Sequence, residues 1–375
     1  MPPAFVKQVF LVYNKFKILT IDKFLFPEHK VPRTDFLVYR KGYPFRELSI
    51  SLDNLPGGTV KSHMQDWYDW TQEEFILVFD HPCWIEPTYG WALVKPFRLL
   101  YYSLGVSRTW FQHKPLFFKF IAKRKVIHVD RVISLRDSGE ENYFHFFNDV
   151  LSKLYFLQLH KIDVANLPVV VSKKLSDKPY FKLYKEHSSF LKSLHWLIQD
   201  DEYIKCSSAI FCKPLTHRPD LWMAIMAPLA IRGKSNTKGD GSKVFLTRHK
   251  SRLRFIENSN QIEMICRKHG FLVLDTDTIS PEQQVEMFSA IQILIGIHGA
   301  GLTNMAFMQG TCHVLEIFPP PSLGYLPFHY IMLAKLFNLN YTALVGDPGD
   351  KYSGGFQLNA NLFEKELIEL ESKQA

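Results

Sequence analysis

The chain has 375 residues, 46% of them hydrophobic and 22% charged, and a formal net charge of +8. This length exceeds the usual single hydrophobic core, so we expect two domains of ordinary size. The composition excludes a disordered or low-complexity chain, and no helix-turn-helix, zinc-finger or RNP-like pattern supports nucleic-acid binding.

The first 48 residues carry nine basic residues against four acidic ones, a net charge of +5. Phenylalanines are interleaved with these charges, which fits either peripheral contact with an anionic membrane surface or a basic edge element packed on the first domain. We favour the second interpretation. No apolar run is long enough for a membrane span or a signal-peptide core. The phenylalanines are Phe5, Phe10, Phe16, Phe24 and Phe26.

The cysteines favour a reducing compartment. Their number is odd, and none forms a CxxC pair with zinc spacing. We therefore expect a cytoplasmic protein, with peripheral contact at the inner face of the plasma membrane as the alternative. The five residues are Cys83, Cys206, Cys212, Cys266 and Cys312.

Residues 1–234 are predicted to form an α/β domain with a less regular pattern than the rest of the chain. Its apolar runs predict strands at 126–135, 167–172 and 203–212, and helices at 142–159, 179–197 and 221–232. The polar, glycine-rich segment 235–242 is the best linker candidate. Ligands commonly bind between two such domains.

Residues 235–375 are predicted to form a Rossmann-like domain with a final amphipathic helix at 361–373. Short strands alternate with single helices, which implies a parallel, doubly wound sheet. The capping pattern Ser280-Pro281-Glu282-Gln283 begins one of these helices. The expected strands are 243–247, 271–275, 292–296, 313–318 and 340–345, and the expected helices follow at 259–269, 281–290, just before Gly310, and 329–337.

The string GIHGAGLTN, residues 296–304, follows the third of these strands and is the strongest local feature. Gly299 and Gly301 lack the Cβ atoms that would keep a ligand from the backbone. The first amides of the following helix have no intrahelical partner and can bind a diphosphate. A tight turn is the simpler alternative.

Two further features can serve the same anion site. The loop TRHKSRLR, residues 247–254, places Arg248 and Arg254 after the neighbouring strand, where guanidinium groups could bind phosphate oxygens; a solvated basic loop is the alternative. Glu316 near a strand end could accept hydrogen bonds from ribose hydroxyls, or else cap a helix or bind an arginine.

His145 and Asp149 lie four residues apart in EENYFHFFNDVLSKLYF, so a helix places them on one face. The helix N-terminus favours a neutral imidazole, which suits a general base, and Asp149 could orient the ring or take the proton itself. Surface or capping roles are the alternative. Asp275-Thr276-Asp277 matches a DxD metal motif, but we favour a loop at the strand end and expect no metal site.

At these residues the chain resembles glycosyltransferase family 61, over about residues 131–347. The resemblance lies in NYFHFFNDVLSKL, LTRHKSRLRFIEN, the long segment from Pro281 to Pro320, and HYIMLAKLFNLNY. It implies a GT-B-like α/β architecture of two Rossmann-like domains facing a cleft, with residues 1–234 as the acceptor-binding domain and residues 235–375 as the nucleotide-sugar-binding domain. It also implies an inverting transfer from a nucleotide-sugar, in the UDP form by our expectation, to a hydroxyl of a glycan acceptor without an obligatory metal.

The family's nucleotide site maps onto Arg248, His298, Gly299, Ala300, Gly301, Thr303 and Glu316, and its histidine in the first domain maps onto His145, with Asp149 beside it. Eukaryotic members are luminal and membrane-anchored, whereas this chain is more similar to bacterial members that build capsule or lipopolysaccharide. A non-catalytic nucleotide- or sugar-binding module of the same fold is the alternative function.

Overall fold

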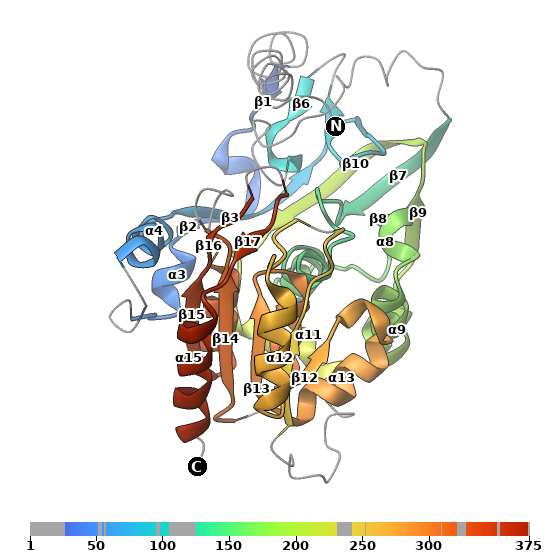
Figure 1. Ribbon diagram of the computed structural model, residues 1–375. Coiled ribbons are helices and arrows are strands. Elements are labelled where there is room, and N and C mark those ends of the chain that lie inside the picture. Colours follow the sequence, from blue (N-terminus) through green and yellow to red (C-terminus); the bar gives the residue numbers. More distant parts are fainter. Residues whose placement is uncertain are drawn as a thin grey trace. The chain divides into compact units, whose positions relative to one another are not determined.

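The computed structural model describes residues 27–51, 55, 58–94, 98–104, 125–230, 242–251, 253–308, 310–320, 328–350 and 353–373. These form two compact mixed α/β units (Figure 1). The first unit contains the described residues up to 41 and those of 73–215, and the second contains those of 42–72 and from 216 onward. Two segments that the sequence assigns to the first domain, 42–72 and 216–230, therefore lie in the second unit.

Several expectations fall outside the described residues. The phenylalanines of the basic N-terminal segment lie in residues 1–26, and the predicted linker lies outside them except for Ser242. Within the described ranges, each helix is too short or too polar to cross a bilayer.

The first unit is built on a ten-stranded mixed sheet. Strand β10 runs parallel to β7, and β7, β8 and β9 continue the parallel part, whereas β3 and β4 pair antiparallel with β10. The strands are β1 (Glu28–His29), β2 (Phe36–Gly42), β3 (Gln72–Phe79), β4 (Cys83–Ile85), β5 (Ala92–Val94), β6 (Arg98–Leu100), β7 (Val126–Ser134), β8 (Val169–Ser172), β9 (Trp196–Gln199) and β10 (Tyr203–Lys213). The predicted strands of residues 126–135, 167–172 and 203–212 are confirmed.

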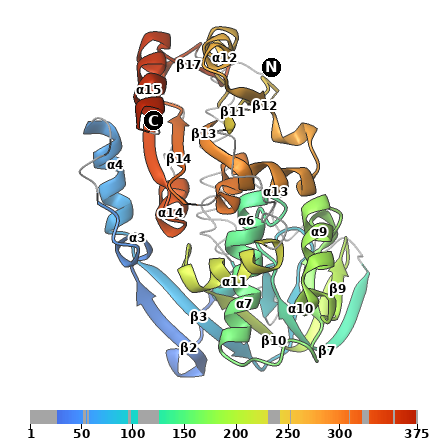
Figure 2. The same cartoon turned by 90° about the horizontal axis from the view of Figure 1, so that it is seen from below.

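A continuous helical segment follows β7, as predicted, and its last part, α7, lies against β10 (Figure 2). The helix predicted at 179–197 is wrong in its second half. Ser188 is extended and its side chain caps Leu191, so a new turn begins there, and Trp196–Gln199 pairs with β8 as strand β9. The helices are η2 (Arg33–Asp35), η3 (Tyr101–Ser103), α6 (Tyr143–His145), the π-helix η5 (Phe146–Leu151), α7 (Ser152–Leu159), α8 (Lys173–Ser176), α9 (Pro179–His187) and α10 (Ser189–Lys192).

The second unit is built on a parallel five-stranded sheet in the order β12-β11-β13-β14-β15. The chain goes from β11 outward to β12 and then returns past β11 to form β13, which makes the β11/β13 boundary the topological switch point. The strands are β11 (Ser242–Leu246), β12 (Leu272–Leu274), β13 (Ile291–Ile297), β14 (His313–Phe318) and β15 (Asn340–Val345), and a small hairpin is formed by β16 (Asp347–Pro348) and β17 (Phe356–Gln357). All five predicted strands are confirmed.

Helices cover both faces of this sheet. On one face α12 and α15 contact each other (Figure 1), and their apolar residues join one buried core with alternate residues of β11, β13, β14 and β15. A second core joins β14, β15 and α14 to α3 and α4. The helices are α3 (Pro44–Glu47), α4 (Gly58–Tyr68), α11 (Pro219–Ala230), α12 (Ser259–Lys268), η6 (Thr276–Thr278), α13 (Pro281–Ala290), η7 (Ala300–Phe307), α14 (His329–Leu336) and α15 (Ala360–Ser372).

Helix α13 begins with the predicted capping box. The backbone N–H of Gln283 donates to the Ser280 hydroxyl (3.3 Å), the backbone N–H of Ser280 donates to the Gln283 side chain (2.8 Å), and Pro281 is the first helical residue. This start sets where the chain turns into β13, which leads directly to the glycine loop.

Replacing Ser280 with alanine should lower the free energy of unfolding by about 1 kcal/mol, because the cap would lose its acceptor. Urea denaturation of the full chain measures this change. Ser289→Ala is the control, since Ser289 lies in the last turn of the same helix and bonds only the Glu286 carbonyl among the contacts described. Equal losses in the two variants would contradict a capping role.

Candidate functional site

The switch point of the second sheet brings together the two loops expected to bind phosphate. Strands β11 and β13 are neighbours, with Leu246 opposite Gly296. Arg248 follows β11 by two residues and Gly299 follows β13 by two. A Cβ atom at Gly299 would lie 2.5 Å from Nη1 of Arg248, so the guanidinium lies directly against the glycine backbone. The predicted convergence of these two loops is thus observed.

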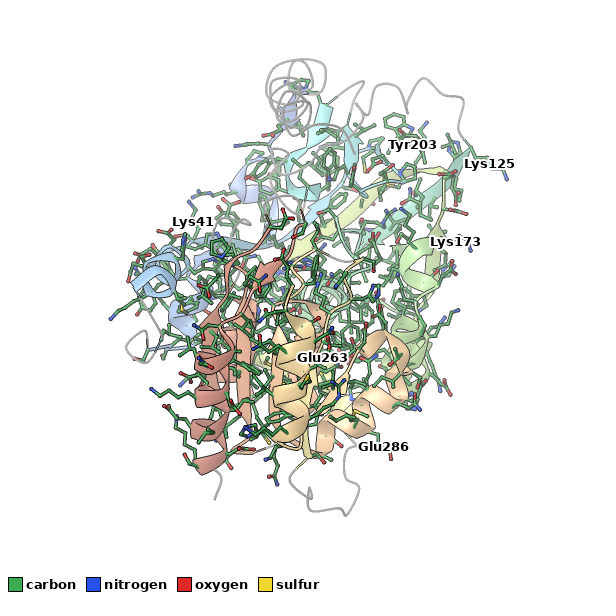
Figure 3. All side chains as sticks on the ribbon, in the orientation of Figure 1. Lys41, Lys125, Lys173, Tyr203, Glu263 and Glu286 are labelled. Atoms are coloured by element: carbon green, nitrogen blue, oxygen red, sulfur yellow. The ribbon has the colours of Figure 1, made fainter. Side chains whose placement is uncertain are left out.

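The loop that carries Arg248 is held at both ends. The Thr247 hydroxyl donates to Glu263 of α12 (2.9 Å), which Figure 3 labels, and Nε of Arg248 donates to the Leu253 carbonyl (2.7 Å). Gly299 has φ 168°, an extended conformation open to any residue. Glycine is therefore required there for space and not for backbone conformation.

The helix that starts at the glycine loop is a 3-10 helix, η7, and its first turn is rigidly supported. The backbone N–H of Leu302 donates to the Gly299 carbonyl (3.0 Å), and the Asn304 side chain donates to the Gly301 carbonyl (3.2 Å) and to Gln284 (2.8 Å). The preceding amides of Ala300 and Gly301 belong to the first turn, where helical amides have no acceptor within the helix. They can donate to an anion.

Glu316 lies beneath the loop and is completely buried. The Nδ1–H of His298 donates to one of its carboxylate oxygens and the Tyr341 hydroxyl donates to the other (2.5 Å). The His298 ring stacks on Phe318 at 5.4 Å and 17°. Because Glu316 holds His298 and has no exposed surface, this geometry favours action through the imidazole over direct contact with a ribose.

Arg254 and Thr303 stand behind the same loop. Arg254 has a left-handed backbone (φ 65°), and its N–H donates to the Gly354 carbonyl (2.8 Å). Burial lowers the pKa of its guanidinium, while the negative charge of Glu316 opposes that shift. Thr303 is only 2% exposed and lies beside the buried Tyr330. Arg254 is thus close enough to Glu316 for their charges to interact, and Thr303 contacts Tyr330, whose ring packs on His298.

In the first unit, His145 and Asp149 form the expected pair. Asn142 caps the helix by accepting from the Phe144 N–H (3.0 Å), and Nδ1 of His145 is 2.5 Å from Oδ2 of Asp149. The two side chains are 39% and 31% exposed. The other oxygen of Asp149 accepts from the Asn148 amide (2.9 Å), so the carboxylate is fixed from both sides.

The pKa of His145 is shifted in the direction opposite to the one predicted from its position near a helix N-terminus. Burial lowers the pKa of His145, but the hydrogen bond and charge of Asp149 outweigh it, so the pKa lies above its ordinary value. Burial raises the pKa of Asp149, but His145 and nearby lysines outweigh that effect, so the carboxyl stays ionised. Nearby carboxylates therefore dominate over the helix dipole, and Asp149 is the fixed anion of the pair.

The DxD pattern has a local structural role. Asp275 caps the 3-10 helix η6 by accepting from the Asp277 N–H (3.0 Å), which is the strand-end loop favoured by the sequence. In the part of the chain that the structure describes, three or more His, Cys, Asp or Glu side chains are nowhere grouped so as to hold a metal ion.

Sequence reasoning assigned no role to Asn148, Asn304, Tyr330 or Tyr341, each of which contacts a candidate site residue. For two of them, Asn148 and Asn304, the sequence contained a signal. Asn148 and Asn304 are polar residues inside apolar helical runs, and buried polar side chains almost always have a hydrogen-bond partner. Such positions next to a motif indicate the groups that hold it in place.

Comparison with known proteins covers the candidate residues of both units. Residues 143–315 match the sequence profile of the family described as Glycosyltransferase 61. The match begins at the helix of His145 and ends in β14, next to Glu316, and so includes Asp149, Arg248 and the glycine loop. No curated protein matches the chain. This span is a glycosyltransferase family 61 domain, which identifies the protein as a glycosyltransferase.

Proposed function

We propose that the protein transfers a sugar from a nucleotide-sugar, a UDP-sugar by preference, to a hydroxyl group of a glycan acceptor with inversion at the anomeric carbon. We further propose that the two units act as the two halves of a GT-B-like enzyme. The observation that carries the proposal is the Arg248 guanidinium lying against Gly299 at the switch point of a parallel sheet.

The donor diphosphate would lie at the loop His298-Gly299-Ala300-Gly301. Three features support this place: the first-turn amides of η7, the fixed guanidinium of Arg248, and the position outside the carboxyl ends of β11 and β13, where doubly wound sheets bind nucleotides. As the bond to the anomeric carbon breaks, negative charge grows on the leaving phosphate. Donors already fixed in place stabilise that charge without reorganisation.

His145 would serve as the general base. Its Nδ1 is engaged by Asp149, which leaves Nε2 as the nitrogen that can accept the proton of an acceptor hydroxyl. The hydroxyl oxygen would attack the anomeric carbon from the face opposite the leaving diphosphate. Asp149 is ionised and fixed by two donors, so it orients the ring and stabilises the imidazolium that forms.

The donor site predicts a specific loss of nucleotide affinity. Arg248→Ala should weaken UDP binding by about 1.5–3 kcal/mol, the scale of a hydrogen bond to a charged group, and leave the fold intact. Gly299→Ala should also weaken binding because its Cβ would displace the guanidinium. In the Arg248→Ala background, Gly299→Ala should then have little further effect. Calorimetric titration with UDP measures all three affinities.

Arg46→Ala is the matched control, because Arg46 is an exposed arginine of the same unit that pairs with Asp69. Its UDP affinity should equal that of the unmodified chain. Unchanged affinity in Arg248→Ala would remove Arg248 from the site. Additive losses in the double variant would mean that the Cβ meets the phosphate itself.

The catalytic pair predicts a loss of turnover without loss of nucleotide affinity. His145→Ala should lower kcat by about 10²–10⁴, the range for a positioned acid or base. Asp149→Asn should cost less, and the double variant should cost little more than His145→Ala, since the two act as a unit. A nucleotide-sugar screen by thermal shift identifies the donor, and release of UDP then reports turnover. If Asp149→Asn proves the more damaging change, Asp149 is the base.

Transfer should not require a divalent cation. The amides and Arg248 would carry the phosphate charge, and Asp275 is engaged as a helix cap. Activity should therefore survive EDTA, and Asp275→Ala and Asp277→Ala should reduce kcat only slightly. Activity lost with EDTA and restored by Mn²⁺, together with inactive Asp275 and Asp277 variants, would establish the DxD pattern as a metal site instead.

A further inference from the structure

A third charged residue continues the face of the helix that carries His145 and Asp149. Lys153 lies one further turn along, and its side chain is only 7% exposed. Its Nζ donates to Oδ2 of Asp137 (2.6 Å) and to the Arg136 carbonyl (3.1 Å). A buried ammonium group is expensive unless it is paired, and here the pairing is with a carboxylate close to the catalytic pair.

The sheet brings Asp137 to this place together with a second lysine. Asp137 follows the carboxyl end of β7, and Lys213 is the last residue of β10, which is parallel to β7 and adjacent to it. These groups line a small cavity of about 20 Å³, enough for one water molecule. The cavity is lined by Asp137, Lys153, Lys213, Ser134, Arg136 and Cys212, among others.

We propose that Lys153 and Asp137 are positioning residues for sugar transfer, a buried ion pair that sets the charge state of the His145–Asp149 pair from one turn below it. This inference rests on the proposed role of His145 as the base. It adds a second layer to that site: His145 and Asp149 face the substrate, and the ion pair acts on them only through its charge.

Acidic and basic groups around the catalytic pair shift the pKa values of its two members in opposite directions. Asp137, Glu141 and Asp149 act on His145 and raise its pKa, and burial opposes them. Lys153 and Lys213 act on Asp149 and help to hold its pKa low. Burial lowers the pKa of Lys153, but Asp137 outweighs it, so the lysine stays cationic. Burial also lowers the pKa of Lys213.

Removing one or the other member of the ion pair should shift the pKa of His145 in opposite directions. Without the Lys153 cation, protonated His145 loses a repelling charge, so the pKa of His145 should rise. Without the Asp137 anion, protonated His145 loses an attracting charge, so its pKa should fall. A pair that only fastened the helix to the strand would change stability in both variants and would not move this pKa in opposite directions.

The test is the titration of His145 in the full chain, followed by the ¹³Cε1 NMR signals of labelled histidines and assigned with His145→Gln. We expect Lys153→Met to raise the midpoint and Asp137→Asn to lower it, each by about 0.5–1 pH unit, the scale of one unit charge at an effective dielectric near 20. Lys153→Arg, which keeps the cation, should titrate like the unmodified chain.

Lys173→Met is the control. Like Lys153, Lys173 pairs with an aspartate (Asp177, 3.4 Å), but it is half exposed. It lies on α8 (Figure 3). Lys173→Met should leave the midpoint unchanged. If Lys153→Met does not fold, Asp137→Asn decides alone, since asparagine preserves the shape and an acceptor for Lys153. Unchanged midpoints, or shifts of the same sign, would overturn the inference.

The titration needs no substrate, so it separates this inference from the proposed function. If the unmodified chain transfers no sugar, the proposed function fails while the titration still decides the charge coupling. If it does transfer sugar, kcat should fall below the pKa of His145. That acidic limb should move to higher pH in Lys153→Met and to lower pH in Asp137→Asn. A limb that stays in place while the NMR midpoints move would overturn the positioning role.

Discussion

The order of strands in the second sheet is the constraint on which the candidate donor site depends. Because β12 lies outside β11 and β13 lies on its other side, the chain leaves β11 toward the face covered by α12 and leaves β13 toward the face that contains η7. The two loops start side by side and then part. A cation from one loop and helix amides from the other can therefore meet at one point, and the Leu253 carbonyl keeps Arg248 there.

The first unit uses the carboxyl ends of parallel strands in the same way, although its sheet is mixed. The four neighbouring strands β10, β7, β8 and β9 are parallel to one another, and Asp137 and Lys213 lie where β7 and β10 end. In each unit a buried acidic side chain near the candidate residues has one buried partner, Lys153 for Asp137 and His298 for Glu316. Removing Lys153 or His298 would leave that acidic side chain without its partner, so each pair constrains its neighbours as a unit.

The regular pattern after Lys243 was sufficient to predict the strands of the second sheet and the cap at Ser280, because period, turn residues and capping pattern all agreed. Of the N-terminal strands, β1 and β4 to β6 could not be predicted, since each has only two or three residues, and β1 and β4 also pair with strands distant in the sequence. The convergence of Arg248 with Gly299 followed from chain order. The burial of Glu316 and the raised pKa of His145 did not, because both depend on side chains that tertiary packing supplies, such as Tyr341 and Asp137.

The π-helix between Phe146 and Leu151 has a consequence for how this segment can change over time. Its backbone hydrogen bonds span five residues, one more than in an α-helix. The Ser152 N–H, for example, donates to the Phe147 carbonyl, five residues back. An α-helix that takes up one extra residue forms a turn of this kind, because the widened turn absorbs the residue and the flanking turns keep their directions. Losing one residue between Asp149 and Lys153 would restore the ordinary α-helical ladder. The seven residues then left from His145 to Lys153 would make about two full turns, so the charged residues would stay on one face. This segment can therefore change in length by one residue and keep its charged face.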